Sequence, residues 1–285
     1  MQIRSKIGGN PALQPETAKI YTAGMVFEPR WFRGFSATVD YYNISIDKAI
    51  ATIGTSLILS QCYPTNPDQA PKYCDKVVRD QNFRIVNVLD INTNVGGDAT
   101  DGIDLALNYL LPTEYGRWNF LFDGTWLHKF DRTLADGSVI HGKNTYDIST
   151  IGGVYPAFKF ISGVRWAYEG VSAGFNTRFF SAFHECGTTT GSFGAGSTCY
   201  ALQQPGSTVG VDSTTSRGVS AYNTWDLFAG YTFPWMAGRS TIGAGVNNIF
   251  NASPPLIYNG GFTPSDPSSY DYLGRFFYGR ISHAF

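Results

Sequence analysis

The sequence lacks both a long apolar segment and a charge imbalance. Hydrophobic residues make up 43% of its 285 residues, yet no stretch approaches the roughly 18 consecutive apolar residues that a membrane-spanning helix requires. Charged side chains are scarce, at 15%, and the net charge is -1. These absences argue against a helical membrane protein and against a basic protein that binds nucleic acid. We therefore expect no nucleic-acid partner.

The N-terminus lacks the features of a secretory signal. Residues 1–6, Met-Gln-Ile-Arg-Ser-Lys, contain no apolar core followed by a small-residue cleavage site. Two interpretations follow: the protein stays inside the cell, or its natural beginning lies outside this sequence.

Motifs for catalysis, metals and cofactors are also lacking. The four histidines (His128, His141, His184 and His283) are scattered among different segments, and none lies beside a plausible serine or cysteine nucleophile in the sequence. The glycine-rich stretch 191–196 is not followed by a helical pattern, so a phosphate-binding loop is not expected. The sequence predicts a protein that is not an enzyme and has no metal or cofactor.

Cysteine is rare, but its four copies form two close pairs. Cys62 lies near Cys74, and Cys186 lies near Cys199, each pair within a segment rich in Gly, Pro, Ser, Thr and Asn. Two local disulfides are the favoured interpretation, and they imply an oxidising compartment. A zinc site or free thiols are the alternatives, although no C-x-x-C spacing with further ligands is present. The connectivity stays open at this point.

Aromatic residues and glycine are abundant. Aromatic residues reach 15% and glycine numbers 32, a composition typical of strands and tight turns. Apolar side chains occupy most of the alternate positions in segments 35–41, 118–130, 154–168, 171–180 and 221–233. Because successive strand side chains point to opposite faces, each segment predicts a strand with one apolar and one polar face.

The pattern predicts an all-β protein with about nine strands. The expected strands are 16–27, 34–46, 84–110, 116–131, 154–168, 170–184, 219–233, 239–250 and 274–285. Short turns at 28–33, 111–115, 169–170 and 234–238 alternate with long connections at 47–83, 132–153, 185–218 and 251–273. This alternation predicts an antiparallel transmembrane β-barrel segment with short periplasmic turns and long extracellular loops. An odd number of strands further predicts a partial barrel.

Three alternatives remain open from the residues alone. A soluble β-sandwich would turn its apolar faces toward a shared core. A secreted carbohydrate-binding β-protein would account for the aromatic residues and disulfides, and it would dissolve without detergent. A small passive porin would also show alternating strands.

Four segments of the chain resemble the barrel of the TonB-dependent receptors. In the order of that family, they are Asn10–Gly24 ("NPxLxPETxxxYxxG"), Val39–Ile50, Gly102–Tyr109 ("GIDLxLxY") and Gly245–Asn251 followed by Pro254 and Pro255 ("GVxNLFDxxPP"). They are spread along the chain, so the resemblance extends over nearly its whole length. The C-terminus resembles the sequence that the barrel-assembly machinery recognises, through Phe277, Gly279, Ile281 and Phe285, although His283 departs from it.

The resemblance implies an outer-membrane receptor that takes up a scarce ligand, such as a siderophore, a vitamin or an oligosaccharide. The expected partners are outer-membrane lipid, the barrel-assembly machinery, the small-molecule or oligosaccharide ligand, and the TonB complex through an N-terminal part that is missing here. Residues 1–285 would be the C-terminal portion of the barrel, without the plug domain, from a fragment, a truncated gene product or a mis-started reading frame. Candidate ligand contacts are Tyr200, Gln203, Gln204, Tyr258, Tyr270 and Tyr272. Groups expected to face the lumen are Asp40, Asp104, Asp123, Lys159, Arg165, Arg178, Asp226 and Arg280.

Overall fold

A computed structural model describes residues 3–64, 68–135, 137–146, 153–185, 217–257 and 265–285. The chain divides into two compact units. The first contains residues 1–20, 44–99 and 131–140, and the second contains residues 21–43, 100–130 and 141–285. Each is described by itself below.

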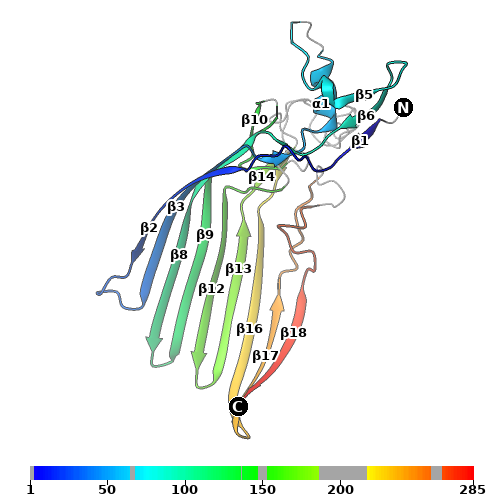
Figure 1. Ribbon diagram of the computed structural model, residues 1–285. Coiled ribbons are helices and arrows are strands. Elements are labelled where there is room, and N and C mark those ends of the chain that lie inside the picture. Colours follow the sequence, from blue (N-terminus) through cyan, green and yellow to red (C-terminus); the bar gives the residue numbers. More distant parts are fainter. Residues whose placement is uncertain (1–2, 65–67, 136, 147–152, 186–216, 258–264) are drawn as a thin grey trace. The chain divides into compact units, whose positions relative to one another are not determined.

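Long antiparallel strands dominate the second unit and form one sheet (Figure 1). The ends of some of these strands extend into residues of the first unit. In sheet order these strands are β18 (Phe276–Ala284), β17 (Gly238–Asn247), β16 (Tyr222–Trp235), β13 (Val171–Phe180), β12 (Phe158–Tyr168), β9 (Gly116–Thr133), β8 (Gly97–Thr113), β3 (Phe35–Asp47) and β2 (Thr17–Phe27). A short strand, β10 (Val139–His141), pairs with β9 as the tenth member. Strands that follow one another in this sheet lie beside one another, so the sheet is a meander of hairpins, which is the topology of a barrel wall.

All nine long strands predicted from the sequence are present, with two corrections. The segment 84–110 is not one strand, because β6 (Ile85–Leu89) belongs to a different sheet and β8 begins only at Gly97. Gly96 has a φ of 72°, and a Cβ atom there would lie 1.9 Å from the Thr133 carbonyl oxygen, so the backbone turns sharply at this residue. The segment 170–184 likewise ends at Phe180, and β14 (Phe183–Glu185) belongs to another sheet.

One face of the large sheet is lined by aromatic side chains. Trp118 packs on Trp166 with ring centroids 6.0 Å apart, and Phe122 packs on Phe160 at 5.3 Å. Trp118 and Trp126 lie eight positions apart on β9, which corresponds to about 27 Å along the strand. For a strand tilted by about 40° this spans a height of roughly 21 Å, close to the apolar band of about 25 Å around outer-membrane barrels.

The first unit is built around a small core of its own. It contains β1 (Arg4–Lys6), β4 (Ile50–Ala51), α1 (Thr55–Cys62), the 3-10 helix η1 (Cys74–Lys76), β5 (Val77–Arg79), β6 and β7 (Thr93–Asn94). The buried core residues are Ile53, Ile58, Cys62, Val77 and Val88. The expected disulfide between Cys62 and Cys74 is present and joins α1 to η1, with a Cα–Cα distance of 4.9 Å. Cys186 and Cys199 lie outside the described residues.

Helices contribute little to this architecture. Within the described residues, no helix is long and apolar enough to cross a membrane.

Removing the Cys62–Cys74 disulfide is expected to loosen the first unit and leave the large sheet intact. The bond closes a loop whose ends are 12 residues apart in sequence, so replacing both cysteines by serine should lower the local stability by about 2 kcal/mol. Hydrogen exchange should rise in α1 and β5 but not in β12 or β13. Faster exchange throughout the large sheet would contradict this expectation.

Candidate functional site

Polar side chains on the face opposite the aromatic one form the inner wall expected of a transporter. The Thr125 hydroxyl donates a hydrogen bond of 2.7 Å to Asp104, and Arg178 lies 3.6 Å from Asp226. The Arg178 side chain is 49% exposed, so solvent weakens this ion pair. On β3, the Asp40 carboxylate lies against Gly24 of β2.

Four of the predicted lumen-facing groups keep their charges unpaired among the described residues. They are Asp123, Lys159, Arg165 and Arg280, all exposed on long strands. An unpaired charge on a strand requires water or a polar partner on that side. The arrangement agrees with an aqueous or protein-filled lumen on this face.

Aromatic side chains lie close against glycines on the inner face. A Cβ at Gly174 would meet the Phe228 ring at 2.6 Å, and a Cβ at Gly245 would meet the Tyr278 hydroxyl at 2.4 Å. The register places Gly174 opposite Phe228 and Gly245 opposite Tyr278. Because glycine has no side chain, each ring covers the neighbouring backbone and holds the two strands together. The sequence analysis did not find these pairs, since only the register reveals them.

A hollow of about 340 Å³ lies on the wall between β3 and β13. Its lining includes the opposite charges of Asp123 and Arg165, together with Asn108 and Asn176. Such a lining can hold a polar group through hydrogen bonds and charge pairing.

A second cluster of buried residues lies beyond the loop ends of β13 and β16. Its members are Tyr146, Phe183, Val219, Tyr222, Ile257 and Tyr270. The cluster includes residues of a small sheet, which is formed by β11 (Thr145–Tyr146), β14 and β15 (Arg217–Val219). In this sheet, Arg217 makes an ion pair with fully buried Glu185 and donates a hydrogen bond of 3.0 Å to the Leu256 carbonyl oxygen. These contacts show that part of the loop region is packed as firmly as a protein interior.

The two candidate ligand contacts within the described residues differ in exposure. Tyr270 is 5% exposed and packs edge-on against Tyr222 at 5.1 Å, whereas Tyr272 is 45% exposed. Burial and the nearby Asp266 carboxylate raise the pKa of the Tyr270 hydroxyl. Tyr272 is therefore the accessible one of the two, and its role in ligand binding stays a prediction. The remaining candidates, Tyr200, Gln203, Gln204 and Tyr258, lie outside the described residues.

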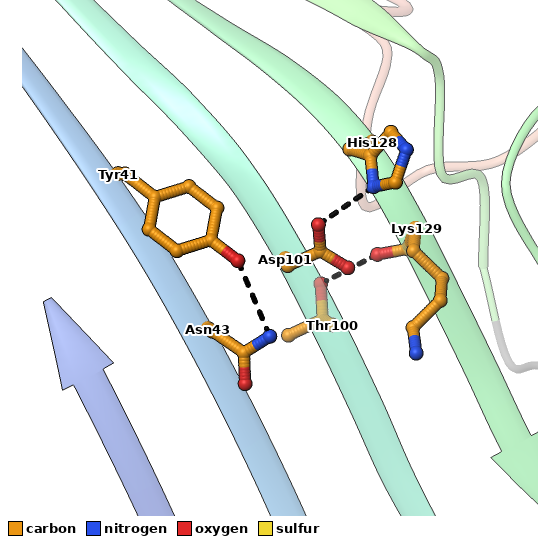
Figure 2. Close-up of polar contacts among 6 residues, drawn as sticks. All are labelled: Tyr41, Asn43, Thr100, Asp101, His128 and Lys129. Carbon is orange, nitrogen blue, oxygen red and sulfur yellow. Dashed lines mark hydrogen bonds and ion pairs between the residues drawn. The ribbon is translucent and has the colours of Figure 1, made fainter.

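The loop end of the aromatic face carries a polar group of residues from three strands. Figure 2 shows Tyr41 and Asn43 on β3, Asp101 on β8, and His128 on β9, with His128 Nδ1 2.7 Å from the Asp101 carboxylate. The Asn43 amide donates to the Tyr41 hydroxyl at 3.3 Å. The sequence analysis did not foresee the carboxylate partner of His128, which lies 27 positions away. In the part of the chain that the structure describes, no group of three or more His, Cys, Asp or Glu side chains could hold a metal ion.

The residues of the predicted assembly sequence lie on the last strand. Phe277, Gly279 and Ile281 alternate on one face of β18 and face Val246, Ala244 and Ile242 of β17. The Phe285 side chain is fully exposed, and its ring lies 4.5 Å from the His283 ring. His283, the departure from the expected pattern, accepts or donates a hydrogen bond of 2.8 Å with Ser240.

Comparison with protein families gives a match over most of the chain. The family model described as "TonB dependent receptor-like, beta-barrel" matches residues 1–249. The chain belongs to the TonB-dependent receptor family. This membership agrees with the sheet topology, the alternating faces and the resemblance found in the sequence. Among curated proteins, none matches this sequence.

Solved structures of TonB-dependent receptors share the fold of the chain. The ferric enterobactin receptor of Pseudomonas aeruginosa (G324V mutant) is similar, with a TM-score of 0.57 and 16% identity over 96% of this chain and 32% of its own. The siderophore receptor PirA of Acinetobacter baumannii has a TM-score of 0.54 and 14% identity over the same shares. The FrpB iron transporter of Neisseria meningitidis (F3-3 variant) has a TM-score of 0.53 and 14% identity, again over 96% and 32%. The chain thus spans about a third of the length of these structures.

Family membership settles the class and the location of the protein. TonB-dependent receptors are β-barrel proteins of the bacterial outer membrane, and they are receptors and transporters, not enzymes. The described strands form an open, partial barrel wall.

Proposed function

We propose that this TonB-dependent receptor carries out energy-coupled uptake of a siderophore. The observation that carries the proposal is the family match over residues 1–249, on a sheet whose apolar face is aromatic and whose other face is charged. The names of the similar structures, which include siderophore receptors, favour a siderophore over a vitamin or an oligosaccharide.

We further propose that residues 1–285 are the C-terminal portion of a longer barrel whose plug domain lies outside them. The chain spans 32% of the similar structures, and in the described sheet β2 and β18 each have a neighbour on one side only. Additional strands would pair with these two edges and close the wall. The plug and the segment that contacts TonB would belong to the same longer protein. Phe285 at the exposed end of the chain would contact the barrel-assembly machinery.

Uptake is expected to depend on TonB. The complete reading frame that contains this sequence would be expressed in an iron-starved strain without its own receptors, with and without TonB, and the entry of radioactive iron bound to a siderophore measured. Accumulation only in the strain with TonB is the expected result. Equal accumulation in both strains would indicate a passive porin. A protein that stays in solution without detergent would indicate a secreted carbohydrate-binding protein.

Replacing Tyr272 by alanine is expected to weaken ligand binding about tenfold, because exposed aromatic side chains contribute strongly where they contact a ligand. Tyr115 provides the matched control, since it is 70% exposed in the short turn between β8 and β9, at the opposite end of these strands. Replacing Tyr115 by alanine should leave affinity unchanged. Binding of labelled siderophore to intact cells measures both. Unchanged affinity in the Tyr272 variant would remove this residue from the ligand site.

A further inference from the structure

The aromatic face of the sheet has a polar patch at its loop end, which we call the rim patch and define as Asp101, Trp126, His128 and Lys143. We propose that the rim patch binds the phosphate-bearing headgroup of a lipid in the outer leaflet of the membrane. The proposal goes beyond ligand uptake and does not depend on which ligand is transported.

Two nitrogen-bearing side chains flank one exposed indole in the rim patch. The Lys143 ammonium lies 5.6 Å from the centroid of the Trp126 ring, and the His128 ring lies 5.5 Å from the same centroid. The Trp126 residue is 42% exposed. One phosphate above the indole can therefore be contacted from both sides, by the ammonium through its charge and by the imidazole through a hydrogen bond.

The lysine is available for such a contact. Among the residues that the structure describes, no carboxylate forms an ion pair with Lys143, whose ammonium contacts only the Trp126 ring. A cation is attracted to an aromatic face, but the ring has no net charge and does not neutralise the cation. Lys143 thus presents, beside the aromatic belt, a positive charge that no carboxylate of the described residues pairs.

Asp101 fixes the direction of the imidazole. Its carboxylate is 11% exposed and lies 2.7 Å from His128 Nδ1, whereas the His128 side chain is 58% exposed. Because Nδ1 faces the buried carboxylate, Nε2 lies on the other side of the ring, where it can bond a phosphate oxygen or hydroxyl. Tyr41 and Asn43 extend the polar surface onto the neighbouring strand (Figure 2).

The position of the patch favours a lipid headgroup as its occupant. Trp126 and His128 follow Phe120 and Phe122 on the same face of β9, toward the long-loop end of the strand. Charged groups on this face would cost about 2–4 kcal/mol if they lay at the middle of the hydrocarbon, so the patch lies at the headgroup level. Indole rings and lysines at that level contact lipid headgroups, and each lysine attracts anionic lipid.

Lipid retention tests the proposal. The full-length protein would be purified in detergent and mixed with phosphatidic acid and phosphatidylcholine of the same acyl chains, and the retained lipids counted by native mass spectrometry. The wild-type protein should retain phosphatidic acid in preference to phosphatidylcholine. Lys143→Ala should reduce this retention about fivefold, His128→Ala should reduce it as well, and Lys143→Arg should preserve it. Lys159→Ala is the control, because Lys159 lies opposite Thr125 on the inner face and its loss should change nothing.

Three results would overturn the proposal: no preference of the wild-type protein for phosphatidic acid, unchanged retention in both the Lys143→Ala and His128→Ala variants, or an equal loss in Lys159→Ala. Displacement of the lipid by millimolar inorganic phosphate would also overturn it, because the patch would then be a site for soluble anions. Siderophore uptake is not measured in this experiment, so its outcome is independent of the proposed transport function.

Discussion

Replacing Phe122 by lysine is expected to destabilise the folded protein by up to about 4 kcal/mol, whereas replacing the adjacent Leu121 by lysine should change its stability little. Both residues are half-buried, apolar and near the middle of β9. Phe122 packs against Phe160 on the aromatic face, and Leu121 lies on the opposite face, where the register pairs it with Gly163 of β12. The difference arises because lysine at position 122 would enter hydrocarbon, while lysine at position 121 would enter a polar lumen.

Reversible unfolding in lipid vesicles, followed by tryptophan fluorescence, measures both free energies. Phe122→Leu is the control for the lost aromatic packing, and it should cost clearly less than Phe122→Lys. Equal costs for the two lysine variants would mean that both faces have the same surroundings. The membrane-wall interpretation of the aromatic face would then be wrong.

Replacing Gly174 by valine is expected to cost about 4 kcal/mol or more and to prevent most of the protein from folding. A Cβ at this position would lie 2.4 Å from the Val164 carbonyl oxygen and 2.6 Å from the Phe228 ring. The carbonyl belongs to the backbone of β12, so it cannot move aside without breaking the β12–β13 pairing. The folded fraction is measured by the slower or faster migration of unheated samples in detergent gels.

Gly218 is the matched control for this substitution. Among the described residues, a Cβ there meets no atom within 4 Å, and the residue lies on β15, outside the large sheet. Gly218→Val should therefore fold as the wild type does. If Gly174→Val folded equally well, Phe228 and the β12 backbone would not lie as close to residue 174 as described.

Local patterns in the sequence predicted the strands of the barrel wall. Alternation over residues 118–130 identifies the two faces of β9 because side-chain direction in a strand depends only on position along the chain. The alternation of short and long connections indicated the hairpin meander. The proximity of Cys62 and Cys74 favoured the disulfide, since residues that close need little chain entropy to meet.

Other features depended on the turns and pairings of the folded chain. The break near Gly96 was missed because β6 and β8 differ in the strands with which they pair, which no local pattern reveals, although the chain turns there against Thr133. The burial of Tyr270 could not be predicted, since its partners Phe180 and Tyr222 are distant in sequence. The identity of the ligand likewise depends on the geometry of the loops.

The amino-acid sequence by itself determined that this protein is a wall of strands with one face for lipid and one for a lumen. The reason is that apolar and polar side chains alternate with a period of two residues along each strand. It also determined the family, through segments spread along the chain. Only the tertiary structure decided which residues meet across the strands: His128 with Asp101, Phe228 with Gly174, and Lys143 with Trp126. The physical reason is that the register between strands, set by the whole sheet, brings together residues that no local pattern connects.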